Sequence, residues 1–504
     1  MIADTLALDG VSLSLEGFVA VARGGAPVVL AEHARVAMQR SYAWVCSMLR
    51  GDRPIYGVNT GFGSLARVRI DPADAATLSR NLIKSHAAGV GAPCPDDIVR
   101  AMMLLRANAL SRGASGCRPA LVETLLTMLA RGVIPIVPMQ GSCGSSGDLA
   151  PLSHLGLVVF GEGGEAWWRG ERLAGAEAMA RAGISALATE AKDGLAMTNG
   201  AQLTTAIAAL AVHDMAVTVR AAEVAAAMSI EALRGVTRAF HPAVHALRPH
   251  PGAIAVAARL RSLLAGSTLT DSLPGKVQDA YSLRCAPVVI GAALDTLAYG
   301  RRVVEIEINA VTDNPVILMD EQDENLAFSA GLFHGEPVGI ACDAMKIAIH
   351  EVASLSERRL YRLTTGSLSS RLPPALAGAD RPGLGMLVPQ TAAAALVSEN
   401  KALGWPASMD SIPTCEDQED HVAMSTTAAW RLREVAANSR CVVAIELLCA
   451  AAALRFRLAE DTGTRLGVGA AAVLPAIERV VSGARTPAEQ IEAVLGWIAR
   501  EDVP

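Results

Sequence analysis

Residues 201–227 read AQLTTAIAALAVHDMAVTVRAAEVAAA, an alanine-rich stretch that is apolar on nearly all sides. His213, Asp214 and Arg220 interrupt it, which argues against a membrane span and for a helix buried inside a protein. Alanine-rich, apolar segments of this kind recur along the rest of the chain, at roughly 200–232, 280–305, 335–364, 388–403 and 419–458. They predict a mainly α-helical protein with a central bundle of long helices, buried by one another or by another subunit.

The composition supports the same fold class. Hydrophobic residues make up 51% of the 504 residues, aromatic residues 4% and charged residues 19%. Alanine and leucine carry the apolar content, whereas a β-sandwich would need more valine, isoleucine and aromatic side chains. A disordered chain is excluded by this hydrophobicity. The net charge of -6, with lysine and arginine scattered, does not suit a nucleic-acid-binding protein.

The cysteines indicate a reducing compartment. There are nine, an odd number, and they show neither a C-x-x-C pair nor the spacing of zinc ligands. Free thiols are the simplest interpretation. The first residues, Met1–Asp4, do not form a basic start followed by an apolar run. We therefore expect a cytoplasmic protein with no membrane partner and no structural metal.

The composition of the chain changes near residue 200, from turn-rich sequence to long alanine-rich segments, which predicts two domains, 1–200 and 201–504. The first is richer in turns; it is expected to contain helices from Asp71-Pro72 to near Gly89, from Pro95 to Leu110 and from Pro119 to Gly132, and a hairpin over 161–173. The second is the long-helix bundle with a C-terminal helical region. Within it, the turn-rich segment 365–385 is a candidate functional loop.

The most unusual stretch is GSCGSSGDLAPL at 141–152. A structural interpretation is a loop that caps a helix beginning at Asp148. It is not a phosphate-binding P-loop, because the sixth position is not glycine and no lysine follows. It is not a nucleophile elbow either, because no serine is flanked as G-x-S-x-G.

A chemical interpretation exists for Ser145-Ser146-Gly147. If the amide nitrogen of Gly147 approaches the carbonyl carbon of Ser145, a five-membered ring can close, and only glycine allows such an approach without a Cβ clash. Loss of water from the ring and from the Ser146 side chain would leave a conjugated methylidene group. The result would be an electrophile made from the chain itself.

Here the sequence resembles the histidine and aromatic amino acid ammonia-lyases, whose loop forms 4-methylideneimidazole-5-one (MIO). The resemblance extends over nearly the whole chain in nine ordered blocks: YGVNTGFG at 56–63, NLIKSHAAGVG at 81–91, GSCGSSGDLAPLSH at 141–154, NGAQ at 199–202, VQDAYSLRC at 277–285, NAVTDNP at 309–315, FHGEP at 333–337, SENKAL at 398–403 and QEDHV at 418–422.

The resemblance implies catalytic roles. Tyr56 matches the base that removes the substrate β-proton, and Asn199 a contact of the cofactor or the substrate amine. Arg284 matches the fork that holds the substrate carboxylate. Gln278 and Tyr281, in the same block, would orient substrate and cofactor, and Phe333 would line the site. Each also has an ordinary structural interpretation as a turn, ion-pair or core residue. Ser145 stands where the family usually has alanine.

Two further blocks bear on the substrate. The pair Ser85-His86 matches histidine-specific members, whereas tyrosine-specific members have His-Leu and phenylalanine-specific ones commonly Phe-Leu. Glu419 matches the acidic residue of histidine-specific enzymes, where aromatic-specific relatives carry glutamine. Imidazole needs polar partners at both ring nitrogens, which a histidine and a glutamate supply. A satisfied core histidine and a glutamate paired with a nearby base are the structural alternatives.

Several positions depart from the family pattern. They are Lys84, Ala286, Val288, Leu332, Leu387 (where histidine-specific members usually have methionine), Trp405 and the run Cys415-Glu416-Asp417. Because of these departures, a modified histidine is also a possible substrate.

The resemblance thus implies a homotetrameric ammonia-lyase that converts L-histidine into trans-urocanate with an MIO group built from residues 145–147. Two alternatives stay open: a lyase or 2,3-aminomutase acting on another aromatic or imidazole amino acid, and a catalytically silent helical scaffold. Intact Tyr56, Asn199 and Arg284 argue against the second.

Overall fold

The computed structural model describes residues 5–51, 54–61, 68–190, 192–323, 325–378 and 385–500. Two compact units form: the first comprises 1–210, 302–342 and 406–430, and the second 211–301, 343–405 and 431–504. Four of the five unit boundaries fall inside long helices: α9 (Gln202–Ala232), α13 (Ala286–Glu307), α14 (Glu336–Thr364) and α16 (Ser425–Glu460). The fifth lies between Trp405 and Pro406, outside these helices. The compact units are therefore discontinuous in sequence, and the division at residue 200 stays a prediction about folding domains.

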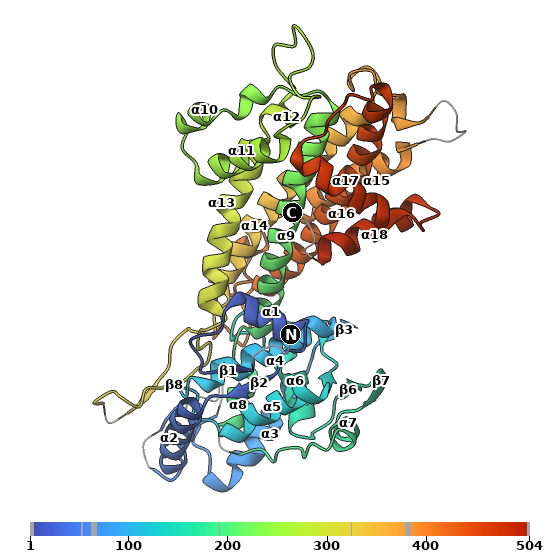
Figure 1. The fold of residues 1–504 in the computed structure, drawn as a ribbon. Coiled ribbons are helices and arrows are strands. Elements are labelled where there is room, and N and C mark those ends of the chain that lie inside the picture. The colour runs from blue at the N-terminus through green and yellow to red at the C-terminus, as the bar shows by residue number, and fades with distance from the viewer. Residues whose placement is uncertain are drawn as a thin grey trace. The chain divides into compact units, whose positions relative to one another are not determined.

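The first unit is built from short helices and small sheets (Figure 1). Its helical elements are α1 (Leu15–Ala22), α2 (Glu32–Met48), η2 (Pro72–Asp74), α3 (Ala75–His86), α4 (Asp96–Ser111), α5 (Pro119–Arg131), α6 (Leu149–Val159), α7 (Gly175–Arg181), α8 (Asp193–Thr198) and η5 (Ala407–Met409). Its strands are β1 (Leu6–Leu8), β2 (Val28–Leu30), β3 (Val90–Pro93), β4 (Ile134–Pro135), β5 (Pro138–Gln140), β6 (Glu165–Trp168), β7 (Glu171–Ala174), β8 (Val316–Ile317) and β9 (Ala327–Phe328). The strands pair as β1-β2, in parallel, and as antiparallel β3-β5, β4-β6-β7 and β8-β9.

The predicted helices and hairpin of this unit are confirmed. The Asp71 side chain accepts a hydrogen bond from the Ala73 amide and caps η2, which leads directly into α3. Helix α5 ends where Gly132 adopts a φ of 69°, the left-handed conformation that commonly terminates helices. The hairpin consists of β6 and β7.

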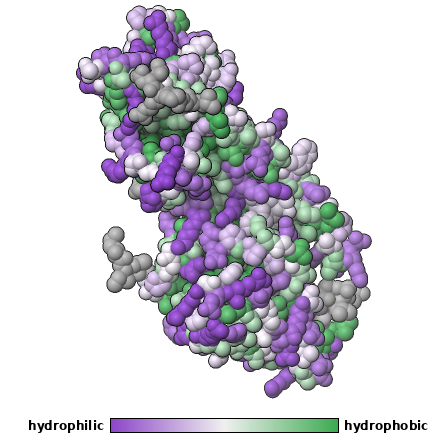
Figure 2. All heavy atoms as spheres, turned by 90° about the vertical axis from the view of Figure 1, so that its right-hand side faces the viewer, coloured by the Kyte–Doolittle hydropathy of each residue, from purple (hydrophilic) through white to green (hydrophobic). Residues whose placement is uncertain are grey.

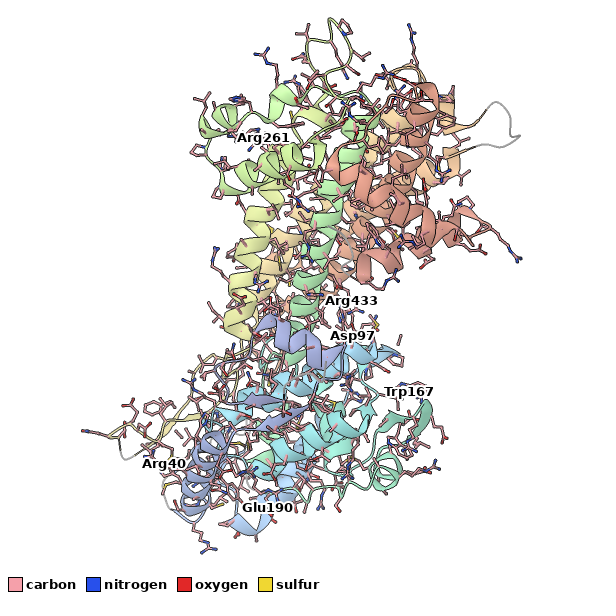
Figure 3. All side chains as sticks on the ribbon, in the orientation of Figure 1. Arg40, Asp97, Trp167, Glu190, Arg261 and Arg433 are labelled. Atoms are coloured by element: carbon pink, nitrogen blue, oxygen red, sulfur yellow. The ribbon has the colours of Figure 1, made fainter. Side chains whose placement is uncertain are left out.

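Helices α3, α6 and α8 pack on one another, and α4 packs on α1 and α5. Polar contacts also tie the 187–190 segment to its neighbours. Glu190, labelled in Figure 3, lies in the first unit. It accepts hydrogen bonds from the Tyr42 hydroxyl at 2.6 Å and from Arg118 Nη1 at 2.9 Å. This framework carries the loop 141–148 between β5 and α6.

The second unit contains η3 (Thr237–Phe240), α10 (Pro242–Ala246), α11 (Pro251–Leu264), α12 (Tyr281–Arg284), η4 (Pro374–Leu376), α15 (Leu387–Leu403), α17 (Val468–Val481) and α18 (Pro487–Ala499), with parts of the four long helices. Helix α9 is long and apolar enough to cross a membrane, but most of its apolar stretch is buried inside the protein. Such burial is what a core helix requires.

The alanine-rich segments are helical as predicted, with two boundary corrections. The segment expected from 280 splits into α12 and α13, and the segment expected from 419 becomes helical only at Ser425. In the second case a bridge between Thr414 and Glu419 and a φ of 47° at Met424 hold the chain out of the helix. Within the candidate loop 365–385, the described residues form turns and η4, and 379–384 lie outside the described residues.

Candidate active site

The loop that precedes α6 is tightly turned. Gly144, Ser146 and Gly147 have φ values of 74°, 52° and 76°, in the left-handed region that a serine rarely adopts. Gly147 forms a β-bridge with Gly200, and a Cβ atom at Gly147 would lie 2.2 Å from the carbonyl carbon and oxygen of Gly200. Only glycine therefore fits at this position.

Asp148 anchors this loop to two other segments. One carboxylate oxygen accepts from Ser142 Oγ at 2.7 Å, Thr204 Oγ1 at 2.9 Å and Thr426 Oγ1 at 2.8 Å, and the other from the Thr204 amide at 2.8 Å. Burial raises the pKa of Asp148, and these hydrogen bonds act in the opposite direction. Asp148 occupies the N-cap position of α6, but its side chain makes no capping hydrogen bond there, because both oxygens are engaged by these donors.

A buried arginine holds the residues on either side of Gly200, the partner of Gly147 in the bridge. Arg106 Nη1 donates to the Asn199 carbonyl at 2.7 Å and to Gln202 Oε1 at 2.9 Å. Gln202 Nε2 in turn donates to Thr312 Oγ1 at 2.7 Å. The geometry of Gly200 is thus fixed by a polar cluster in which Arg106 is fully buried.

A cavity of about 730 Å³ opens above the loop, within the first unit. Seven of the predicted site residues line it: Tyr56, His86, Ser145, Ser146, Asn199, Phe333 and Glu419. Gly147 is buried beside them. Asn199 Nδ2 donates to the Asn314 carbonyl at 3.3 Å, and its Oδ1 has no hydrogen-bond partner among the described residues. A buried acceptor in a cavity wall is available to a ligand donor.

His86 and Ser85 differ in position although they are adjacent. His86 lines the cavity, whereas Ser85 does not. His86 Nδ1 lies 2.9 Å from the Leu82 carbonyl and 2.9 Å from Ser85 Oγ. Because a carbonyl can only accept, the first contact places a proton on Nδ1 and leaves Nε2 for a ligand. Ser85 thus contacts the His86 ring without lining the cavity itself.

Glu419 is fixed at both carboxylate oxygens. Oε1 accepts a hydrogen bond from Ser146 Oγ, and Oε2 accepts one from Thr414 Oγ1 at 2.6 Å. The Thr414–Glu419 bridge holds the backbone at this place. The carboxylate therefore faces the tripeptide directly. Its partners are two hydroxyl groups, and not the basic side chain that the alternative interpretation of Glu419 as an ion-pair residue requires.

Sequence reasoning assigned no role to several residues of the cavity wall. They are Leu82, Leu149, Leu195, Thr198, Asn314, Ser329, Ala330, Gly331, His334, Cys415, Gln418, Asp420 and His421. His334 and His421 belong to the blocks FHGEP and QEDHV, so these motifs could have identified both histidines as site residues. Their rings stack with centroids 5.5 Å apart.

Four predicted site residues, the catalytic Tyr281 and the substrate-binding Gln278, Arg284 and Leu387, belong to the second unit and are not among the residues that line this cavity. Tyr281 is 70% exposed and Leu387 47%, and Gln278 is also exposed. Arg284 Nε donates to the Asp279 carbonyl at 2.8 Å, and its guanidinium lies 4.6 Å from the centre of the Tyr281 ring. Their roles in catalysis and binding stay predictions.

Comparison with known proteins identifies the family. A family model described as aromatic amino acid lyase matches residues 13–479. The histidine ammonia-lyase of Gloeobacter violaceus is 48% identical over 489 residues, covering 96% of this chain and 94% of that protein. The histidine ammonia-lyase of Geobacillus kaustophilus is 49% identical over 453 residues, with 89% and 88% covered.

Solved structures agree. The histidine ammonia-lyase of Trypanosoma cruzi has a TM-score of 0.90 at 35% identity, covering 99% of this chain and 94% of that chain. The tyrosine aminomutase of Streptomyces globisporus has a TM-score of 0.91 at 34% identity, with 99% and 97% covered. The match over nearly the full length, together with the loop and the cavity, means that this chain belongs to the aromatic amino acid lyase family.

Proposed function

We propose that this protein is a carbon–nitrogen lyase that eliminates ammonia from L-histidine to give trans-urocanate. The observation that carries the proposal is the presence of His86 and Glu419 in the wall of the same cavity as Ser145 and Ser146. Relatives that are 48–49% identical over most of the chain are histidine ammonia-lyases, which supports the same substrate.

The cofactor of this proposal is MIO, formed from Ser145, Ser146 and Gly147. The residues present fit it: positive φ values at Ser146 and Gly147 turn the chain tightly, and no Cβ could be accommodated at Gly147. Once formed, the group supplies an electrophilic carbon and an electron sink for the substrate amine. All other steps fall to side chains of the protein.

We assign those steps to residues of the cavity wall. Tyr56 removes the β-proton, which is weakly acidic and needs a well-oriented base. Asn199 offers its unpartnered Oδ1 to the substrate amine. Phe333 closes the wall beside the ring and excludes water.

His86 and Glu419 select the imidazole. Nε2 of His86 meets a substrate ring nitrogen, as an acceptor when His86 is neutral and as a donor when it is protonated. Glu419 accepts from the opposite ring nitrogen once the Ser146 hydroxyl has been lost to the cofactor. A phenyl ring would leave both groups unpaired at a cost of about 1–3 kcal/mol each.

The remaining binding groups, Gln278, Tyr281, Arg284 and Leu387, are proposed to reach the cavity of another subunit in a homotetramer. The exposure of Val277 (90%), Tyr281 (70%) and Leu247 (87%) supports an uncovered contact surface in the second unit. Hydrophobic areas also interrupt the hydrophilic surface on the face shown in Figure 2. The Arg284 fork would hold the substrate carboxylate. We place the protein in the cytoplasm, which its nine free cysteines support.

A substitution at His86 tests the substrate assignment. His86→Leu should lower kcat/KM for histidine by at least tenfold, while kcat/KM for phenylalanine stays unchanged or rises. The ratio of the two values is the readout, because general damage to the site cancels in it. An equal loss for both substrates would refute the role of His86 in recognising the ring.

A further inference from the structure

The Ser146 side chain, which must lose its hydroxyl to become the methylidene group, is hydrogen-bonded to one titratable residue. Its Oγ donates to Glu419 Oε1. The other oxygen of Glu419 is held by Thr414 Oγ1 at 2.6 Å, so the carboxylate cannot turn away from Ser146 without breaking a second hydrogen bond. The precursor thus presents a fixed carboxylate to its own leaving group.

We propose that Glu419 catalyses the loss of water from Ser146 during formation of the cofactor, in addition to its part in binding substrate. This inference rests on the cofactor proposed above. It gives Glu419 two successive tasks at one place, the first on the chain and the second on the substrate ring.

The first task follows ring closure. When the Gly147 nitrogen has bonded to the Ser145 carbonyl carbon, that carbonyl oxygen leaves as water with the amide hydrogens of Ser146 and Gly147. The Cα–H of Ser146 then lies beside a carbonyl and a conjugated C=N bond, which acidifies it.

Glu419 acts on this intermediate. Its carboxylate removes the Ser146 Cα proton, and the electron pair of the C–H bond becomes the Cα–Cβ double bond. The same proton passes to Oγ as the Cβ–Oγ bond breaks, and the hydroxyl departs as water. The carboxylate is regenerated, so no other reactant is consumed. Proton transfer by a positioned side chain typically contributes about 10²- to 10⁴-fold to a rate.

The neighbouring acid Asp148 is not equipped for this task. Its two oxygens already accept four hydrogen bonds, from Ser142, Thr204 and Thr426, and none from Ser146. Cys143 and Cys415 lie near enough to Glu419 for its charge to contribute to their raised pKa values, for which burial is the larger cause. A thiol with a raised pKa stays protonated at neutral pH, so neither cysteine can serve as the base.

Cell-free synthesis of the full chain, sampled over time by intact-mass measurement, tests the proposal. Wild type should become two waters lighter than its sequence. Glu419→Ala and the nearly isosteric Glu419→Gln should lose the second water about a hundredfold more slowly, because neither can relay the proton. Glutamine keeps the size and an acceptor, so a role limited to packing would leave its rate unchanged.

Glu416→Gln is the matched control. Glu416 is an exposed carboxylate of the same loop and is not among the residues that line the cavity. It should mature at the wild-type rate. Ser146→Ala fixes the mass of a chain that cannot form the methylidene.

The outcomes separate this inference from the proposed function. If both Glu419 variants lose two waters as fast as wild type, the role of Glu419 in maturation is refuted, while the proposed function stands. If wild type itself never becomes lighter, the proposed cofactor fails and the inference fails with it. Slow water loss in both Glu419 variants, with normal maturation of Glu416→Gln, supports the inference whatever the substrate proves to be.

Discussion

Gly147 is the position where the backbone geometry most directly limits the chemistry. A Cβ at this position would lie 2.2 Å from the carbonyl carbon and oxygen of Gly200, whereas ordinary contacts begin near 3.4 Å. Gly147→Ala must therefore displace one backbone segment by about 1.2 Å. The same displacement moves the Gly147 amide, the group that must bond to the Ser145 carbonyl carbon if the proposed cofactor is to form.

The expected loss of stability has two parts. A φ of 76° costs an alanine about 1–2 kcal/mol, and the forced displacement adds about 1–3 kcal/mol, as overpacking does in cores. Gly170→Ala isolates the first part, because Gly170 has a φ of 82° and no described atom lies within 4 Å of the position that a Cβ would take there. Gly147→Ala should thus be destabilised by about 1–3 kcal/mol more than Gly170→Ala.

Two measurements check this. Thermal unfolding is compared for both alanine variants in a Ser146→Ala background, where cofactor formation contributes to neither. Intact mass is then measured with Ser146 present: Gly170→Ala should be two waters lighter than its sequence, and Gly147→Ala should keep the full mass. A Gly147→Ala protein that is as stable as Gly170→Ala and still loses two waters would refute the reasoning.

Three further substitutions give predictions, two in the loop of the site and one at Glu307 of α13. Asp148→Asn turns an amide group toward donors such as the Thr204 amide, which lies 2.8 Å from the carboxylate. It should therefore lower the free energy of unfolding by about 2–4 kcal/mol and slow formation of the cofactor. Unchanged thermal unfolding would contradict the anchoring role of Asp148. Ser145→Ala removes a buried hydroxyl with no partner among the described residues, so it should be stabilising by about 1 kcal/mol and keep the mass deficit, and a destabilised or full-mass product would count against it. Desolvation raises the pKa of Glu307 to about 7 from an ordinary 4.5, so the folded state holds a proton that the unfolded state releases. Glu307→Gln should therefore leave the free energy of unfolding unchanged below pH 4.5 and raise it progressively as the pH increases to 7. Above pH 7 the gain should reach about 3 kcal/mol. A gain in denaturant unfolding that does not depend on pH would exclude the raised pKa of Glu307 as its cause.

The helices were predictable because their determinants are local. Asp71 and Pro72 mark the start of a helix, Gly132 marks the end of another, and the alanine-rich segments can be satisfied only as buried helices. The start of α16 was not predictable in this way, because the chain ahead of Ser425 is held out of the helix by a backbone bridge between Thr414 and Glu419 and by a hydrogen bond between their side chains.

The site was only partly predictable. The motifs identified Tyr56, Asn199 and Glu419, but their meeting in one cavity depends on chain segments separated by more than 300 residues. Sequence proximity was also misleading, since Ser85 and His86 are adjacent on α3 and only His86 lines the cavity. The hydrogen bond from Ser146 to Glu419 joins two blocks that no spacing rule connects.

Removal of ammonia from histidine can be tested directly on the wild-type protein. The most direct measurement incubates the purified wild-type protein with L-histidine, L-phenylalanine and L-tyrosine separately, and quantifies ammonia, the conjugated acrylate and the β-amino acid in each reaction. We predict equimolar ammonia and trans-urocanate from histidine, with kcat/KM at least a hundredfold above that for either aromatic substrate. A β-amino acid formed without release of ammonia, or a preference for phenylalanine or tyrosine, would contradict it.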